Sequence, residues 1–175
     1  DKFDPTLKAA LLQMKIIADT SSILLSDIDY VEDLELKTSL WINNDVNRAK
    51  TTRHEITSLK GLEYFSSLRR LKLVGNRTDT LECIPNFSRF KELRELEIIQ
   101  IYLPILDISG CKNLTTLSCR SCDLNTIDLK KNIQLRTLDC TYNRLTELDL
   151  SHNKQLRTVI VKSQRNKGLL SEGGR

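Results

Sequence analysis

Several features that define common protein classes are missing from this chain of 175 residues. Gly and Pro contribute only 6 and 3 residues while 39% of the chain is apolar, which excludes collagen-like, low-complexity and wholly disordered proteins. No stretch approaches the roughly 18 uncharged apolar residues of a membrane-spanning helix. The sequence shows no basic start followed by an apolar run and a cleavage site, so no signal peptide is visible. Because the chain begins at Asp1 without Met, earlier removal of a leader is left open.

An excess of charge of one sign is also missing, and aromatic residues are few. The net charge is +4, with Lys and Arg interleaved among Asp and Glu. A nucleic-acid binder more often carries a single-sign stripe and a pI above the value of 8.8 found here, so we expect no nucleic-acid partner. Aromatic residues make up 5% of the chain, which disfavours a carbohydrate-binding or cell-wall-binding surface built on aromatic platforms.

The cysteines do not form the even framework of a small disulfide-stapled domain, since there are five of them: Cys83, Cys111, Cys119, Cys122 and Cys140. The Cys119–Cys122 spacing resembles half of a metal site, but no second half and no suitably spaced His accompany it. Buried cysteine behaves as a small apolar residue. We therefore predict buried structural thiols, with no metal site and no cofactor.

Catalytic residues are equally scarce. The chain has two histidines, His54 and His152, and neither has an evident nucleophile or orienting partner in the sequence. No Gly-rich loop that could hold a phosphate is present. We predict that the protein is not an enzyme.

What the chain has in excess is leucine, at 30 of 175 residues, because of an internal repeat. Leu93, Leu114, Leu135 and Leu156 are each 21 residues apart and each opens a segment of the form L-x-x-L-x-(I/C/V). An earlier copy, L-x-x-L-x-L-x-x-N, begins at Leu68. Six strand-like cores are predicted, centred on Trp41, Lys72, Glu97, Ser118, Asp139 and Ile160.

This repeat predicts a solenoid. The L-x-L core is a short strand whose leucines enter the interior while the residue between them faces outward. A single turn cannot bury its own apolar face, whereas stacked turns bury a continuous one. Asn76 and Asn143 are expected to bond the backbone where the strand bends, with Cys122 at the same position of its turn. The predicted fold class is α/β: a leucine-rich repeat solenoid with a short parallel sheet on its concave face and an N-terminal helical cap.

The predicted organisation has three parts. Residues 1–37 form the cap, 38–163 the solenoid of about six turns with a polar insertion near 43–55, and 164–175 a C-terminal tail. In the cap, Asp4-Pro5 predicts the start of a helix with a stripe of Leu7, Ala10, Leu11, Met14 and Ile17. A second short helix is expected to open at Ser26 and to run through Ile28, Val31 and Leu34. The last turn has no equivalent cover.

Two sets of acidic residues raise the question of calcium. Asp107, Asp128 and Asp149 recur every 21 residues, where Asp commonly accepts backbone N–H bonds in a turn, and we predict that they are structural. The segment from Asp19 to Tyr30 resembles an EF-hand loop in position only. Its sixth residue is Leu24 rather than Gly and its twelfth is Tyr30 rather than Glu, so we expect no calcium there.

The outward positions of the predicted sheet form the candidate binding surface. Charge alternates from turn to turn on this surface, which suits a specific protein partner better than a polyanion. Trp41 is the only Trp and is either an exposed interface anchor or a residue that the insertion buries. The predicted protein-binding residues are Trp41, Arg70, Lys72, Glu95, Glu97, Ile99, Ser118, Arg120, Asp139, Thr141, Ile160 and Lys162.

The FDPTLKAALL start, the ITSLKGLEYFSSLRRLKLVGN block and the LDLSHN-type turns resemble internalin-like leucine-rich repeat proteins, in the 21-residue form of gut Bacteroidetes. The resemblance implies a bacterial protein that is exported, either secreted or at the cell surface, and that binds a protein or peptide. An alternative is a structural role by self-association through the weakly capped C-terminal turn, where Val159, Ile160 and Val161 offer an apolar strand edge.

Overall fold

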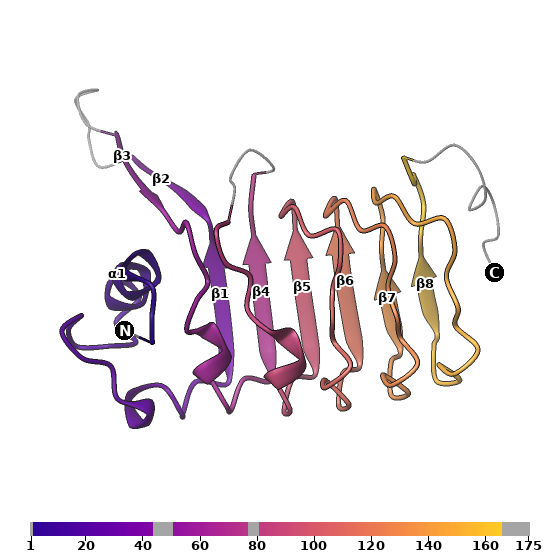
Figure 1. The fold of residues 1–175 in the computed structure, drawn as a ribbon, viewed down its shortest axis with the longest axis horizontal. Helices are drawn as coiled ribbons and strands as arrows, with labels where there is room; N and C mark the ends of the chain where they lie inside the picture. The colour runs from indigo at the N-terminus through magenta and orange to yellow at the C-terminus, as the bar shows by residue number, and fades with distance from the viewer. Residues whose placement is uncertain (1, 44–50, 77–80, 166–175) are drawn as a thin grey trace.

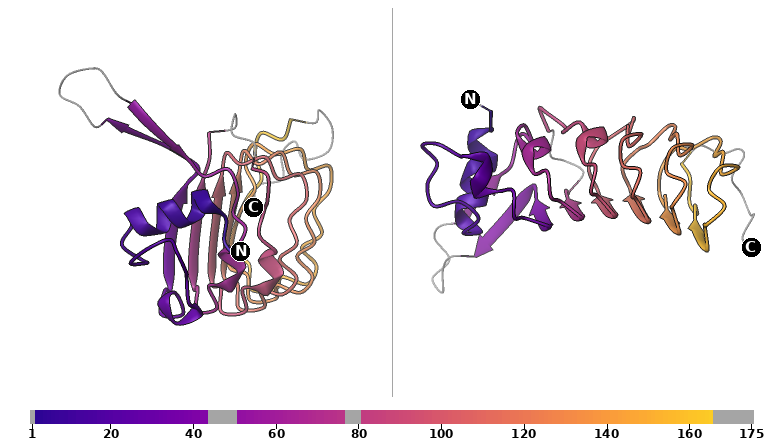
Figure 2. Two further views of the ribbon diagram at one scale, coloured as in Figure 1. Left: turned by 60° about the vertical axis from the view of Figure 1, so that its left-hand side comes forward. Right: turned by 90° about the horizontal axis from the view of Figure 1, so that it is seen from below.

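The computed structural model describes residues 2–43, 51–76 and 81–165, without the side chains of residues 39–43 and 51–55. The chain forms a solenoid in which parallel strands line one side and turns with short 3-10 helices line the other (Figure 1). Viewed along the strands, the two sides are separate layers with the core between them (Figure 2). Within the described residues, no helix is both long and apolar enough to cross a membrane.

The main sheet has six parallel strands in the order β1-β4-β5-β6-β7-β8. Their bounds are β1 Asp33–Lys37, β4 Arg70–Val74, β5 Glu95–Ile99, β6 Thr116–Arg120, β7 Thr137–Asp139 and β8 Thr158–Ile160. The repeat leucines stay in register across the sheet, so that Leu71 pairs with Leu96 and Leu96 with Leu117. These leucines are at most 1% exposed, which confirms the predicted parallel solenoid and its inward positions. The placement of the sheet on a concave face stays a prediction.

The first strand of the sheet is not where the repeat placed it. We expected it at Trp41, but Trp41 belongs to β2 (Ser39–Asn43), which pairs antiparallel with β3 (Thr51–Glu55) in a separate two-stranded hairpin. This hairpin projects from the end of the solenoid (Figures 1 and 2). The strand that pairs with β4 is β1, with Leu34 opposite Leu71 and Leu36 opposite Leu73. The sheet therefore begins at Asp33, inside the segment 1–37 expected to form the cap.

The cap begins as predicted and then differs. Helix α1 (Pro5–Gln13) starts at Asp4, whose carboxylate accepts a 2.8 Å hydrogen bond from the Thr6 backbone N–H. Leu7 and Leu11 are fully buried against the first turns. The predicted second helix is wrong, because only a three-residue 3-10 helix, η1 (Leu25–Asp27), forms there. Its cap is Asp27, which accepts from the Leu24 N–H, because the leucine that would extend the helix stripe is committed to β1.

The side opposite the sheet is built from short turns. The apolar residues spaced by three from Ile56 to Leu68 are all buried, and they include the 3-10 helix η2 (Leu62–Tyr64). The next turn contains η3 (Phe87–Arg89). In this layer Gly110 lies so close to the preceding turn that an added Cβ would be 1.7 Å from the Ser88 carbonyl oxygen. Adjacent turns are therefore in direct backbone contact here.

A column of polar side chains fixes the bend after each strand. Asn143 accepts hydrogen bonds from the N–H groups of Cys122 and Leu124, at 3.0 and 3.2 Å, and donates to the Cys140 carbonyl at 2.9 Å. Cys122, at the same position one turn earlier, donates through Sγ to the Ile98 carbonyl at 3.3 Å. These contacts confirm that Asn143 bonds the backbone at the bend.

A second column lies on the other side of the core. Asn132 donates to the Cys111 carbonyl, and Asn153 donates to the Asn132 carbonyl, both at 2.9 Å. Cys111 opens the column with a contact of 3.0 Å from Sγ to the Phe87 carbonyl. Because all three side chains are at most 3% exposed, the column links consecutive turns through buried hydrogen bonds.

Candidate functional site

The candidate site is the outward surface of the main sheet, called here the sheet face. It consists of the outward residues of the strands from β1 to β8 together with Thr141 and Lys162. Alternate residues of the strands from β1 to β7 are buried and solvent-accessible, as the repeat predicts, and β8 is exposed throughout. Parallel pairing brings these outward residues into rows across the sheet, and strands in such a sheet lie about 4.8 Å apart.

One row carries the two charges that the repeat singled out most strongly. Lys72 and Glu97 are paired in register on β4 and β5, and their charged atoms lie 3.7 Å apart. Lys72 also approaches Glu35 on β1 at 3.6 Å. In the neighbouring row, Arg70 lies between Asp33, at 3.0 Å, and Glu95, at 3.6 Å. Each cation of β4 is thus flanked by carboxylates from both neighbouring strands.

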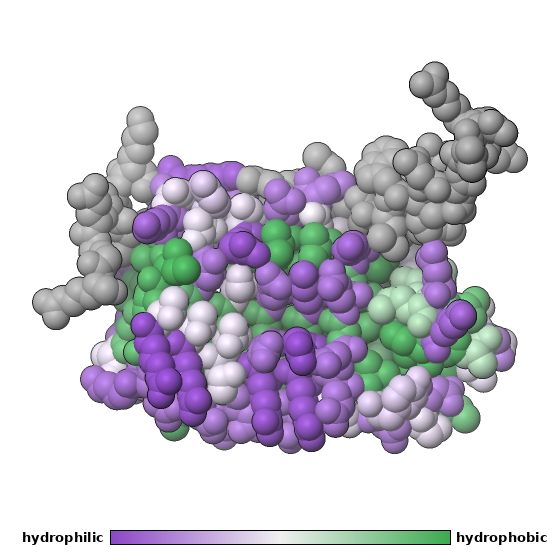
Figure 3. All heavy atoms as spheres, turned by 180° about the vertical axis from the view of Figure 1, so that it is seen from behind, coloured by the Kyte–Doolittle hydropathy of each residue, from purple (hydrophilic) through white to green (hydrophobic). Residues whose placement is uncertain are grey.

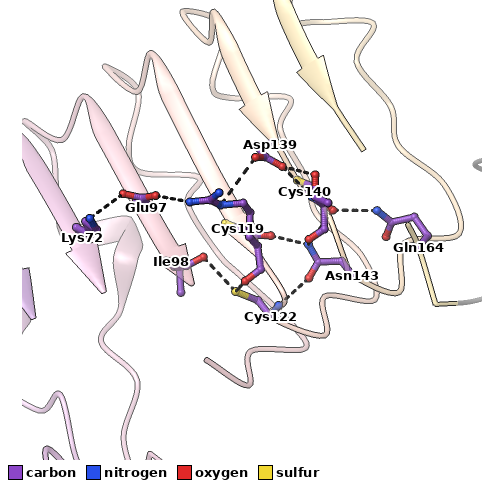
Figure 4. A network of polar contacts seen from close by, with 11 residues as sticks. Lys72, Glu97, Ile98, Cys119, Cys122, Asp139, Cys140, Asn143 and Gln164 are labelled. Atoms are coloured by element: carbon purple, nitrogen blue, oxygen red, sulfur yellow. Dashed lines mark hydrogen bonds and ion pairs between the residues drawn. The ribbon is translucent and has the colours of Figure 1, made fainter. Parts of the chain in front are cut away.

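Arg120 extends this chain of charges across a strand. Its own register partner is Ile99, yet its guanidinium reaches sideways to Glu97 at 2.9 Å and to Asp139 at 3.9 Å (Figure 4). The residue between Glu97 and Asp139 in their row is Ser118. A serine side chain is short enough to leave that place to the guanidinium. The result is a continuous series of alternating charges that runs from β1 to β7.

The C-terminal part of the sheet face is more neutral. Asp139 is held by its own turn, because its carboxylate accepts from the Thr141 N–H at 3.0 Å and from the Thr141 hydroxyl at 2.6 Å. Ile160 on β8 is paired with Asp139 and is 38% exposed. Lys162 follows that strand and is exposed. The face therefore changes along the solenoid axis from a charged network to isolated polar and apolar groups.

Hydrophobic surface is distributed unevenly on this side. Figure 3 shows the sheet face with hydrophilic groups over its middle and hydrophobic groups toward both ends and near the carboxyl ends of the strands. Val74 and Ile99 are half-buried neighbours at those carboxyl ends. A flat surface with charged rows next to apolar groups resembles the mixture found in specific protein interfaces.

Eleven of the twelve predicted binding residues lie together on the sheet face. The exception is Trp41, which lies on the β2–β3 hairpin, and whether it is exposed or covered falls outside the described side chains. The sequence interpretation missed the outward residues of β1: Asp33, Glu35 and Lys37. The signal was present, because Val31, Leu34 and Leu36 repeat the spacing of Leu68, Leu71 and Leu73.

The other acidic candidates are held within their turns. Asp107, Asp128 and Asp149 each accept a bond of 2.9 to 3.0 Å from the backbone N–H two residues later, as predicted for structural residues. Backbone and hydroxyl donation from Ser109 lowers the pKa of Asp107 below its usual value. Among residues 2–43, 51–76 and 81–165, no group of three or more His, Cys, Asp or Glu could hold a metal ion.

The thiols are free and, apart from Cys83, buried. Burial raises the pKa of Cys111 and of Cys140 to about 12, and it raises the pKa of Cys119 well above the ordinary value. A thiol is a poor nucleophile and metal ligand, since both roles require the thiolate. These three cysteines therefore serve as small apolar core residues.

The fold and the sheet face define a leucine-rich repeat solenoid of the internalin type. Two solved structures from Listeria monocytogenes are similar to it. One, described as the functional domain of InlJ, which includes a cysteine ladder, is 20% identical with a TM-score of 0.60. It matches 85% of this chain and 33% of its own length. The other, internalin C2, is 18% identical with a TM-score of 0.64 over 92% of this chain.

The chain spans 65% of internalin C2, so it corresponds to a part of each of these proteins. No protein-family model matches the sequence, and no curated protein matches it. The structural likeness establishes the fold. The 21-residue form of gut Bacteroidetes stays a prediction.

Proposed function

We propose that the protein is a non-enzymatic module that binds a protein or peptide on the sheet face. The observation that carries this proposal is the series of alternating charges from Glu35 through Lys72, Glu97 and Arg120 to Asp139. These side chains hold one another in place before any partner arrives. Binding then costs less side-chain entropy than it would on a surface of independent charged residues.

The balance of charge favours a protein over a polyanion. Acidic residues at the outward positions are Asp33, Glu35, Glu95, Glu97 and Asp139, and basic residues are Lys37, Arg70, Lys72, Arg120 and Lys162. Five charges of each sign give a neutral face, whereas attraction to nucleic acid needs a surplus of cations. Alternating charges instead discriminate between partners, because a mismatched partner places like charges together.

The test is affinity capture with the whole chain, from bacterial envelope and from animal epithelial surface extracts. The wild type is compared with Glu97→Lys, with Lys72→Glu and with a matched control, Lys131→Glu, an exposed charge reversal away from the sheet. A prey retained by the wild type is purified and titrated against all four proteins. We expect both sheet-face variants to bind at least about tenfold more weakly, about 1.4 kcal/mol, and the control to bind normally.

Thermal unfolding of the same four proteins separates binding from folding. These ion pairs are largely solvent-exposed, so each reversal should change stability by only about 0–1 kcal/mol. Unchanged affinity of both sheet-face variants for every captured prey would argue against the proposal.

Two finer parts of the proposal have their own tests. Trp41→Ala asks whether the hairpin contributes to capture of the same prey. Export, either to the cell surface or as a secreted protein, rests on the resemblance to internalins, and fractionation of the producing bacterium tests it.

A second candidate function is assembly through the C-terminal turn. It is favoured by the exposure of Val159, which is 39% exposed although it occupies an inward position of the repeat. Light scattering over a wide concentration range tests self-association directly.

A further inference from the structure

The C-terminal end of the solenoid presents core positions to solvent. Val159 is in register with Leu138 of β7, yet Leu138 is fully buried while Val159 is 39% exposed. The difference arises because no strand among the described residues pairs with the outer edge of β8. Leu148, Leu156 and other apolar residues of the last turn are only partly buried. An apolar end of this kind gains free energy when another surface covers it.

This end is also uniformly basic. Residues 150–165 contain four cations and no carboxylate: Lys154, Arg157, Lys162 and Arg165. Arg165 is occupied by Asp123 of an earlier turn, at 3.1 Å. The other three are exposed and make no ion pair among the described residues. The rim of the apolar end is therefore positive.

The opposite end has the opposite charge. Residues 16–36 contain six carboxylates and no cation: Asp19, Asp27, Asp29, Glu32, Asp33 and Glu35. The last three pair with cations of β4 and its preceding residue, Arg69. The first three lie on the cap, are exposed, and make no ion pair within the described part of the chain. Three unpaired carboxylates at one end thus match three unpaired cations at the other.

Apolar groups accompany the carboxylates of the cap. Leu24, Leu25 and Tyr30 are 61%, 47% and 63% exposed and lie between or next to the acidic residues. A hollow between α1 and β1 is lined mainly by apolar side chains, among them Met14 and Leu36. Both ends of the sheet face show hydrophobic surface in Figure 3. The two ends are therefore alike in their apolar content and differ in the sign of their charge.

We propose that the basic C-terminal turn of one molecule docks on the acidic N-terminal cap of a second copy. This inference rests on the assembly function given above and specifies its second surface. Apolar contact supplies the attraction and charge sets the direction, since two basic ends repel each other and so do two acidic ends. The contact is heterologous, and repetition of such a contact produces a ring or an open filament.

The test is sedimentation velocity of the whole chain over a wide range of concentration, at low and at high salt. Two charge-reversed variants are compared with the wild type. The C-end variant is Lys154→Glu/Arg157→Glu, and the N-end variant is Asp19→Lys/Asp29→Lys. Lys130→Glu, an exposed reversal in a middle turn, is the matched control.

We expect the wild type and the control to associate with increasing concentration, and the association to weaken with salt. Each end variant alone should associate at least about tenfold more weakly. An equimolar mixture of the two should associate again, because each altered end then meets an end of opposite charge. The salt dependence of the wild type does not depend on how well the variants fold.

The outcomes separate this proposal from the broader one. If the N-end variant associates normally while the C-end variant does not, the C-terminal turn binds a second C-terminal turn, and only the head-to-tail arrangement is wrong. If neither variant changes the association, charge does not direct it and the proposal fails. If the wild type stays monomeric at every concentration, both the arrangement and the assembly function are wrong. None of these results bears on the sheet-face proposal, which has its own variants.

Discussion

The side-chain amides of Asn143 and Gln164, one turn apart, both donate to the carbonyl oxygen of Cys140, each at 2.9 Å. Gln164 also accepts from the Leu145 N–H at 3.0 Å, as Asn143 accepts from Cys122 and Leu124. One carbonyl thus serves two consecutive bends. The solenoid is held together at this corner by side chains that bond the backbone of the turn before them.

Asn143→Ala should therefore be strongly destabilising. The substitution leaves the N–H groups of Cys122 and Leu124 without their side-chain acceptor in a buried position. We expect the free energy of unfolding to fall by about 3 kcal/mol in urea denaturation. Asn125→Ala, at an exposed position, is the control and should change it little. A loss below about 1 kcal/mol for Asn143→Ala would contradict the role assigned to the bend.

The buried thiols predict a loss of stability in alkali. Burial raises the pKa of Cys140 from 9.0 to about 12, so the unfolded chain releases this proton at a lower pH than the folded protein does. The stabilisation is fully present below pH 9.0 and is lost as the pH rises toward 12. In that window this thiol should contribute a decline of about 1.4 kcal/mol per pH unit.

The measurement is urea denaturation at a series of pH values for the wild type and for Cys140→Val. Lysines of the unfolded chain titrate in both proteins, so the difference between them isolates the thiol. The variant should show the shallower decline, and identical slopes would show that Cys140 ionises equally in the folded and unfolded states.

Asp123 is predicted to stabilise the last two turns. Its side chain is 13% exposed and accepts from Arg144 at 3.3 Å and from Arg165 at 3.1 Å, residues that follow it by one and two repeats. Asp123→Asn should lower the free energy of unfolding by about 1–2 kcal/mol. The exposed Asp128→Asn, in the next turn, serves as the control. Added salt should narrow the gap between wild type and Asp123→Asn, and a gap independent of salt would speak against an ionic origin.

Gly110→Ala should distort the contact between neighbouring turns. The added Cβ would meet the Ser88 carbonyl oxygen at 1.7 Å, and backbone cannot move aside as a flexible side chain can. We expect a loss of about 2–3 kcal/mol in the free energy of unfolding, measured by thermal or urea denaturation. Ser109→Ala, at the preceding position, should have a small effect by comparison. Wild-type stability of Gly110→Ala would mean that the turns separate easily at this point.

Much of the sheet face was predictable because its information is local. A strand alternates its side chains with a period of two, so Lys72 and Glu97 had to face outward once Leu71 and Leu73 faced inward. A fixed spacing of 21 residues then aligns equivalent positions of consecutive turns. The ion pair between Lys72 and Glu97 follows from the unequal spacing of 25 only after the strands have been paired.

Two features depended on contacts that the sequence does not specify. Both the segment at Leu34 and the segment at Trp41 have a strand-like pattern, and the choice between them was made by pairing with Leu71 across a long intervening stretch. The reach of Arg120 to Glu97 and Asp139 depended on the space above Ser118.

The sequence by itself therefore determined the solenoid, the parallel strands and the inward residues, because spacing and alternation are properties of neighbouring residues. Only the tertiary structure decided which segment became the first strand and which charges meet on the sheet face. It also placed the acidic cap and the basic last turn at opposite ends. Those outcomes depend on how distant segments pack and pair, which spacing along the chain does not encode.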